Sequence, residues 1–77
     1  MIYKSRLLNT IHWDKSTDDY GVSHYKVLVD GKEHAKASLQ QHTLRNLDPG
    51  SYMIEIIAVD FTGKESPVSP KFQYTHQ

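Results

Sequence analysis

The segment from Leu47 to Ser66 constrains the fold of this chain more than any other part of the sequence. Within it, residues 51–60 read SYMIEIIAVD, and every second residue falls on the same side: Tyr52, Ile54, Ile56, Ala58 and Asp60. Successive side chains of a β-strand point to opposite faces, so strict alternation over this length indicates a strand with one buried face. The turn-forming residues DPG at 48–50 and TG at 62–63 bound the segment. We therefore predict a long strand between two tight turns.

The position of Tyr52 shortly after the first turn is informative in its own right. A tyrosine just after a Pro-Gly turn is typical of a tyrosine corner, in which the phenol hydrogen-bonds to the connection between two strands of a β-sandwich. We expect the Tyr52 hydroxyl to bond a backbone group within residues 46–49, with Leu47 filling the core beneath it. A sandwich of this kind mostly binds or holds other molecules, so the segment indicates a fold more clearly than a reaction.

The rest of the chain predicts short strands separated by turns, and no helix. These strands are expected at about residues 7–13, 25–29, 32–37, 42–45 and 71–75. The first should end in an aromatic anchor at Trp13, and Asp30-Gly31 is a strong hairpin signal. The strand after this hairpin is polar, which is typical of a sheet edge. Pro67 and Pro70 mark the start of the last strand, because proline cannot occupy a central ladder.

The order and spacing of these motifs resemble a fibronectin type III domain, most closely the bacterial branch. The matching stretches are IHWDKSTDDYGVSHYKVLVDGK, HTLRNLDPGSY and IIAVDFTGKESPVS, and together they run from about Ile11 to Thr75. The resemblance implies an all-β, immunoglobulin-like antiparallel β-sandwich in which strands A, B and E face strands C′, C, F and G. It implies one such domain over residues 1–77, expected to belong to a larger multidomain chain. Four residues match the family's core positions: Trp13, Tyr25, Leu47 and Tyr52.

Two positions carry further expectations from the resemblance. Only 12 residues precede Trp13, whereas the family usually has a longer first strand. We therefore expect strand A to be stunted, or to be completed by residues outside this chain, which would leave strand B with an open edge. The family often has glycine where this chain has Asn46, so we expect a left-handed backbone conformation there.

Composition excludes several classes of partner. Nine basic and nine acidic residues give a formal net charge of zero, so no strong field attracts nucleic acid. The longest apolar run, Ile56 to Val59, is far too short for membrane insertion. The chain has no cysteine, and residues 1–6 lack the features of a signal peptide. An extracellular or cell-surface location is therefore implied by the resemblance alone.

The residues with chemical potential predict no catalytic, metal or cofactor site. The five histidines do not pair at metal-ligand spacing, although His42 takes a position that the family usually fills with an apolar or aromatic residue. Asp14, Asp18 and Asp19 lack the spacing of a calcium loop and are expected to cap turns. The serines lie in turns without the context of a nucleophile. We expect a domain that is not an enzyme.

One feature departs from an ordinary sandwich surface. If Ile54 and Ile56 face the core, the alternation turns four apolar side chains outward: Leu28, Met53, Ile57 and Val59. Outer faces of antiparallel sheets are normally polar, so these residues form a candidate interaction patch. The alternative is that long side chains such as those of Lys26, Lys71 and Gln73 cover it. Together with an open strand B, the patch predicts weak self-association.

The resemblance implies a function only at the level of the domain type. We expect a non-catalytic module that acts as a spacer or accessory protein-interaction domain in a larger extracellular bacterial protein such as a glycoside hydrolase. Its partners would be neighbouring domains of the parent chain or another protein. The alternative is a structural or docking domain of a phage or cell-surface assembly. Polysaccharide binding is a third reading, for which only Tyr3, Tyr20 and Phe61 offer exposed aromatic rings.

Overall fold

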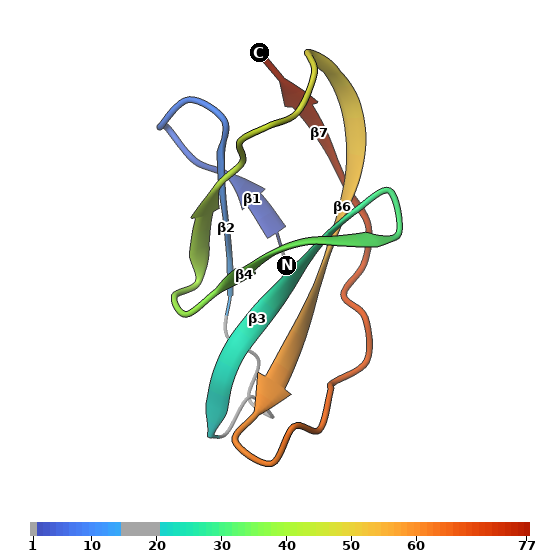
Figure 1. The fold of residues 1–77 in the computed structure, drawn as a ribbon. Helices are drawn as coiled ribbons and strands as arrows, with labels where there is room; N and C mark the ends of the chain where they lie inside the picture. The colour runs from blue at the N-terminus through green and yellow to red at the C-terminus, as the bar shows by residue number, and fades with distance from the viewer. Residues whose placement is uncertain (1, 15–20) are drawn as a thin grey trace.

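A computed structural model of the chain describes residues 2–14 and 21–77, and the described part contains seven β-strands and no helix (Figure 1). The strands are β1 (Ile2–Lys4), β2 (Thr10–Trp13), β3 (Val22–Val29), β4 (Lys32–Ala37), β5 (Gln41–Thr43), β6 (Gly50–Asp60) and β7 (Phe72–His76). Their positions agree with the predicted strands to within a few residues, except at the start of the chain. The molecule measures 36 × 23 × 19 Å along its principal axes.

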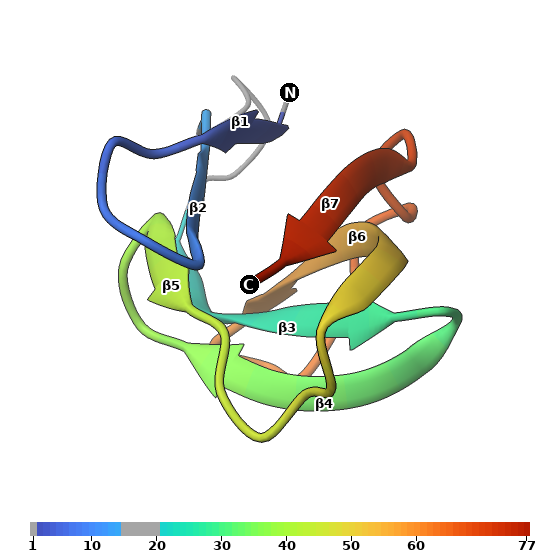
Figure 2. The same ribbon diagram turned by 90° about the horizontal axis from the view of Figure 1, so that it is seen from above.

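The strands form two antiparallel sheets that pack face to face (Figure 2). One sheet has the order β1-β2-β5, and the other has the order β4-β3-β6-β7. This is an immunoglobulin-like antiparallel β-sandwich, and the predicted fold class is confirmed. The two sheets correspond to strands A, B and E and to strands C′, C, F and G, and the polar strand β4 lies at a sheet edge as expected.

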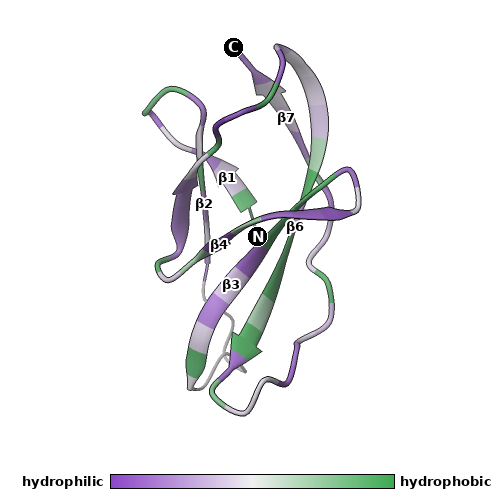
Figure 3. Ribbon diagram, in the orientation of Figure 1, coloured by the Kyte–Doolittle hydropathy of each residue, from purple (hydrophilic) through white to green (hydrophobic). Residues whose placement is uncertain are grey.

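The core forms where the alternating apolar residues of both sheets meet. Ile11 on β2, Val27 on β3 and Ile54 on β6 are fully buried, and Trp13 retains only 4% exposure. The Trp13 and Tyr25 rings meet edge to face with centroids 5.4 Å apart, a favourable aromatic arrangement. Strand β6 carries much of the hydrophobic surface, whereas β4 and β5 are largely hydrophilic (Figure 3).

The start of the chain differs from the predicted strand over residues 7–13. Leu7 and Leu8 are exposed, at 59% and 68%, and lie in the turn between β1 and β2. The turn depends on Asn9, which adopts a φ of 55°, a conformation that asparagine tolerates better than other non-glycine residues. The predicted strand is therefore wrong over residues 7–9, because Asn9 adopts a turn conformation and β2 begins only at Thr10.

Strand A is short, as expected, but it comes from this chain itself. Strand β1 pairs antiparallel with β2, with Ile2 opposite Trp13 and Lys4 opposite Ile11. Strand β5 pairs with the other side of β2, so β2 lies between two neighbours. The expectation of an open edge at strand B is therefore wrong, and so is the part of the self-association argument that depended on it.

Asn9 also joins the first turn to the end of the last strand. Its side-chain oxygen accepts hydrogen bonds from the Tyr74 hydroxyl and the Gln77 backbone N–H, both at 3.0 Å. Its amide group donates to the Gln77 carbonyl at 3.0 Å. The Tyr74 hydroxyl is in turn hydrogen-bonded to the buried ring of His76. One side chain thus ties the two sheets together at this end of the sandwich.

The tyrosine corner is present in the connection between β5 and β6. The Tyr52 hydroxyl donates to the Asp48 carbonyl at 2.6 Å, within the segment where this bond is expected. Asn46 adopts a φ of 60°, which confirms the predicted left-handed conformation. Leu47 is only half-buried, however, and the fully buried leucine of this connection is Leu44. Leu47 packs against the core cluster, so the prediction is confirmed in part, although Leu44 takes the more deeply buried position.

Truncation of Trp13 tests the register of the core. Trp13→Ala should lower the free energy of unfolding by about 3–5 kcal/mol, because it removes a buried ring and leaves a cavity. Trp13→Phe is the matched control, since it keeps a ring against Tyr25 and deletes a buried Nε1–H that has no hydrogen-bond partner among the described residues. Urea unfolding measures both. Equal stability of Trp13→Ala and the parent would contradict this core.

Removal of the Tyr52 hydroxyl tests the corner. Tyr52→Phe should cost about 1 kcal/mol, because a single hydrogen bond to the Asp48 carbonyl is lost while the ring stays in place. Thermal unfolding followed by circular dichroism measures the change. A variant as stable as the parent would show that the bond contributes nothing to stability.

Candidate functional site

The candidate interaction patch lies on the outer face of the four-stranded sheet. Strands β3 and β6 pair with Val27 opposite Ile56 on the inner face, and this register places Leu28, Ile57 and Met53 on the outer face. Leu28 and Ile57 are half-buried there, and Met53 is 37% exposed. The structure therefore places three of the four predicted residues on one accessible surface.

Val59 does not belong to this accessible surface. It is only 5% exposed, although it lies outside the main core cluster. The chain after β6 turns back, and Val59 forms an isolated bridge with Glu65. Ser66 and Ser69 then hydrogen-bond to Ala58 and Ile56, so this segment runs along the edge of β6. The prediction of Val59 as an exposed residue is wrong, because alternation along a strand assigns a side chain to a face but does not say what packs on that face.

An ion-pair group further reduces the apolar character of the patch. Lys26, opposite Ile57 in the neighbouring strand, forms ion pairs with Glu65 and, at 3.6 Å, with Glu33. The hydrogen bond to Glu65 raises the pKa of Lys26 above its usual value, and both carboxylates add to the effect. This partly agrees with the alternative that long side chains cover the patch.

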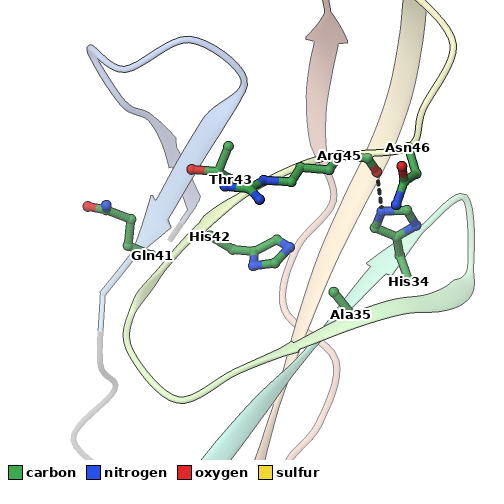
Figure 4. Close-up of a pocket in the computed structure, with 7 residues that line it drawn as sticks. All are labelled: His34, Ala35, Gln41, His42, Thr43, Arg45 and Asn46. Carbon is green, nitrogen blue, oxygen red and sulfur yellow. Dashed lines mark hydrogen bonds between the residues drawn. The ribbon is translucent and has the colours of Figure 1, made fainter.

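A separate pocket lies between the edge strands of the two sheets, β4 and β5, and has a volume of about 470 Å³ (Figure 4). Its lining combines basic, polar and small side chains: His34, Ala35, Gln41, His42, Thr43, Arg45 and Asn46. In Figure 4 the Gln41 side chain points away from the others. The groups that give the pocket its chemistry are therefore His34, His42 and Arg45.

Three local features build this pocket. The pairing of β3 with β4 shifts by one residue between Val27 and Leu28, which leaves His34 as the extra residue of a β-bulge. A bulge redirects a side chain, and His34 donates from Nε2 to the Arg45 carbonyl at 3.0 Å. Thr43 holds β5 to β2 through a 2.8 Å hydrogen bond between its hydroxyl and that of Thr10. The walls of the pocket are therefore held by specific bonds.

The electrostatic character of the pocket is positive. Burial lowers the pKa of the half-buried His42 below its usual value, and the neighbouring charges of His34 and Arg45 lower it further. Within residues 2–14 and 21–77, the salt bridges all involve Lys26, so no carboxylate neutralises these three groups. The lining of the pocket contains no carboxylate, and its arginine and histidines can hold an anion or a proton.

Sequence reasoning identified His42 as unusual but did not predict the pocket. The unusual feature was a histidine at a position that the family fills with an apolar or aromatic residue. The sequence could not predict that His34 lines the same pocket as His42, because the β-bulge in β4 turns its side chain there. In the described part of the chain, no group of three or more His, Cys, Asp or Glu side chains is arranged to hold a metal ion.

The other residues singled out from the sequence do not come together. Tyr3 and Phe61 are exposed, at 37% and 78%, but they lie on β1 and in the turn after β6. Asp14 accepts a 2.6 Å hydrogen bond from the Tyr3 hydroxyl, which raises the pKa of Tyr3. Asp18, Asp19 and Tyr20 fall outside the described residues.

Comparison of the chain with protein-family models, with curated proteins and with solved structures finds no match. Among the residues that the structure describes, no helix could cross a membrane.

Charged substitutions at Ile57 and Val59 test the corrected outer face. Ile57→Lys should change the free energy of unfolding by no more than about 0.5 kcal/mol, because the side chain can reach solvent. Val59→Glu should cost at least about 2 kcal/mol, because it places a carboxylate at a buried position beside Glu65. Chemical denaturation of both variants gives the comparison. Equal tolerance of the two substitutions would show that Val59 is exposed in solution.

Proposed function

We propose that this chain is a non-catalytic, fibronectin type III-like module that acts as a spacer or accessory interaction domain in a larger extracellular bacterial protein such as a glycoside hydrolase. The observation that carries the proposal is the combination of the strand order β1-β2-β5 facing β4-β3-β6-β7 with the tyrosine corner at Tyr52. The sequence motifs that resemble the family supply the expected setting. Neighbouring domains of the parent chain are the proposed partners.

The path of the chain supports a role in series with other domains. Ile2 pairs with Trp13, the last residue of β2. Gln77 is hydrogen-bonded to Asn9, which immediately precedes the first residue of β2. The two ends of the described chain therefore lie at different levels of the sandwich (Figure 1). A domain with this geometry can be joined to one neighbour on each side without rearranging its sheets.

The lining of the pocket differs from that of a glycoside-hydrolase active site. Glycoside hydrolysis generally uses two carboxyl groups on opposite sides of the bond to be cleaved. The pocket between β4 and β5 instead combines two histidines with an arginine. The burial of Val59 reduces the outer patch on which the alternative of a phage or cell-surface docking domain depended.

The coding sequence on either side of this domain tests its proposed setting. We expect a continuous reading frame that joins the domain to a carbohydrate-degrading or surface domain, with a secretion signal upstream. Sequencing of the natural gene and of its transcript provides the measurement. Tail or capsid segments in the same frame would instead support the docking alternative.

An activity assay on the purified domain tests its non-catalytic character. Incubation with cell-wall polysaccharides and with chromogenic glycosides should release no product above that of a buffer control. The matched control is His42→Gln, which removes the half-buried titratable group of the pocket. Turnover by the parent that is lost in His42→Gln would contradict the proposal.

A further inference from the structure

We propose that the pocket between β4 and β5 is a binding site for an oxyanion, such as the carboxylate, sulfate or phosphate group of a small ligand. The groups that would hold the anion are Arg45 and His42, with His34 contributing positive charge from the opposite wall. This inference goes beyond the role of the domain in a longer chain and does not depend on it.

The size and the lining of the pocket suit a small anionic ligand. Its volume of about 470 Å³ falls within the range typical of small-molecule sites. The guanidinium of Arg45 is planar and presents paired N–H donors, a geometry that matches an oxyanion. Thr43 and Asn46 add polar side chains to the lining (Figure 4).

The basic groups of the pocket have no carboxylate partner in the described part of the chain, in contrast to Lys26 on the outer face. Lys26, on the outer face, is paired with both Glu33 and Glu65. Arg45, His34 and His42 form no salt bridge within the described residues, although His42 is half-buried. The permanent charge of Arg45 beside the half-buried His42 favours an anion, because Coulomb attraction is stronger at a partly buried site than in bulk water.

The backbone around the pocket is held in place without a ligand. The hydrogen bond from His34 to the Arg45 carbonyl joins β4 to the segment after β5. Asn46, with its φ of 60°, turns the chain immediately after Arg45. A site whose backbone is already held in place loses less entropy when it binds a ligand.

Binding should be coupled to the protonation of His42. The charges of His34, on β4, and of Arg45, just after β5, both lower the pKa of His42. Ile11, which pairs with His42 from β2, carries no charge. These surroundings favour the neutral ring in the free protein, and a bound anion would favour the charged ring. The anion is therefore taken up together with a proton, and affinity rises as the pH falls through the titration of His42.

Sulfate is a suitable probe, because its own charge does not change between about pH 5 and 8. The purified domain is titrated with sodium sulfate at constant ionic strength, and nitrogen-15 NMR follows the backbone amides. We expect saturable shifts confined to β4, β5 and residues 44–46, with tighter binding near pH 5 than near pH 8. Parallel titrations with acetate and inorganic phosphate show whether a carboxylate or a phosphate binds better.

Variants separate a specific site from general attraction to positive charge. Arg45→Gln should weaken sulfate binding about tenfold or more, because a charge-assisted contact is lost. Arg6→Gln is the matched control, since it removes the same charge from outside this pocket and should leave binding unchanged. His42→Gln should reduce the pH dependence. Shifts spread over all lysines and arginines, or equal effects of Arg45→Gln and Arg6→Gln, would overturn the proposal.

Discussion

The antiparallel pairing of β3 with β6 is the constraint on which the rest of this structure depends. Its register places Val27 opposite Ile56 and Val29 opposite Ile54, and all four side chains are buried. Cross-strand pairs of this kind stabilise a sheet, and a slip of one residue would move every one of them to the outer face. The small three-stranded sheet then packs its own apolar residues against this surface. The chain has no cysteine, so it relies on this packing in place of disulfides.

Residues with positive φ determine how the strands are connected. Asn9, Asp30 and Asn46 all adopt φ values between 51° and 60°, each in a turn between strands. Asn9 and Asp30 also use their side chains across the structure, since Asn9 binds Tyr74 and Asp30 accepts a 2.9 Å hydrogen bond from the Met53 N–H. Asparagine and aspartate tolerate this conformation and can bond to nearby backbone groups. The turns at Asn9 and Asp30 therefore also tie together parts of the chain that are distant in sequence.

The edges of the two sheets meet in different ways on the two sides of the sandwich. This difference creates the pocket. On one side β1 contacts β7, and the side chain of Asn9 joins the two sheets. On the other side β4 and β5 are polar edge strands that are not hydrogen-bonded to each other along their length (Figure 2). Edge strands must avoid uncontrolled pairing, and charged or polar side chains serve that purpose. Here the same polar side chains gather into a positively charged space, which links edge protection to the proposed anion site.

Short-range periodicity and turn chemistry in the sequence determined the long strand at residues 50–60, the hairpin at Asp30 and the hydroxyl bond of Tyr52. The immunoglobulin-like order of the strands was implied by the family resemblance. Tertiary structure decided the rest. Packing around the end of β6, where the chain returns at Glu65, leaves Val59 buried, and the bulge at His34 brings that ring towards Arg45. Alternation assigns a side chain to a face of its own strand. It carries no information about which distant segment covers that face, and so the accessible surface and the pocket follow from packing.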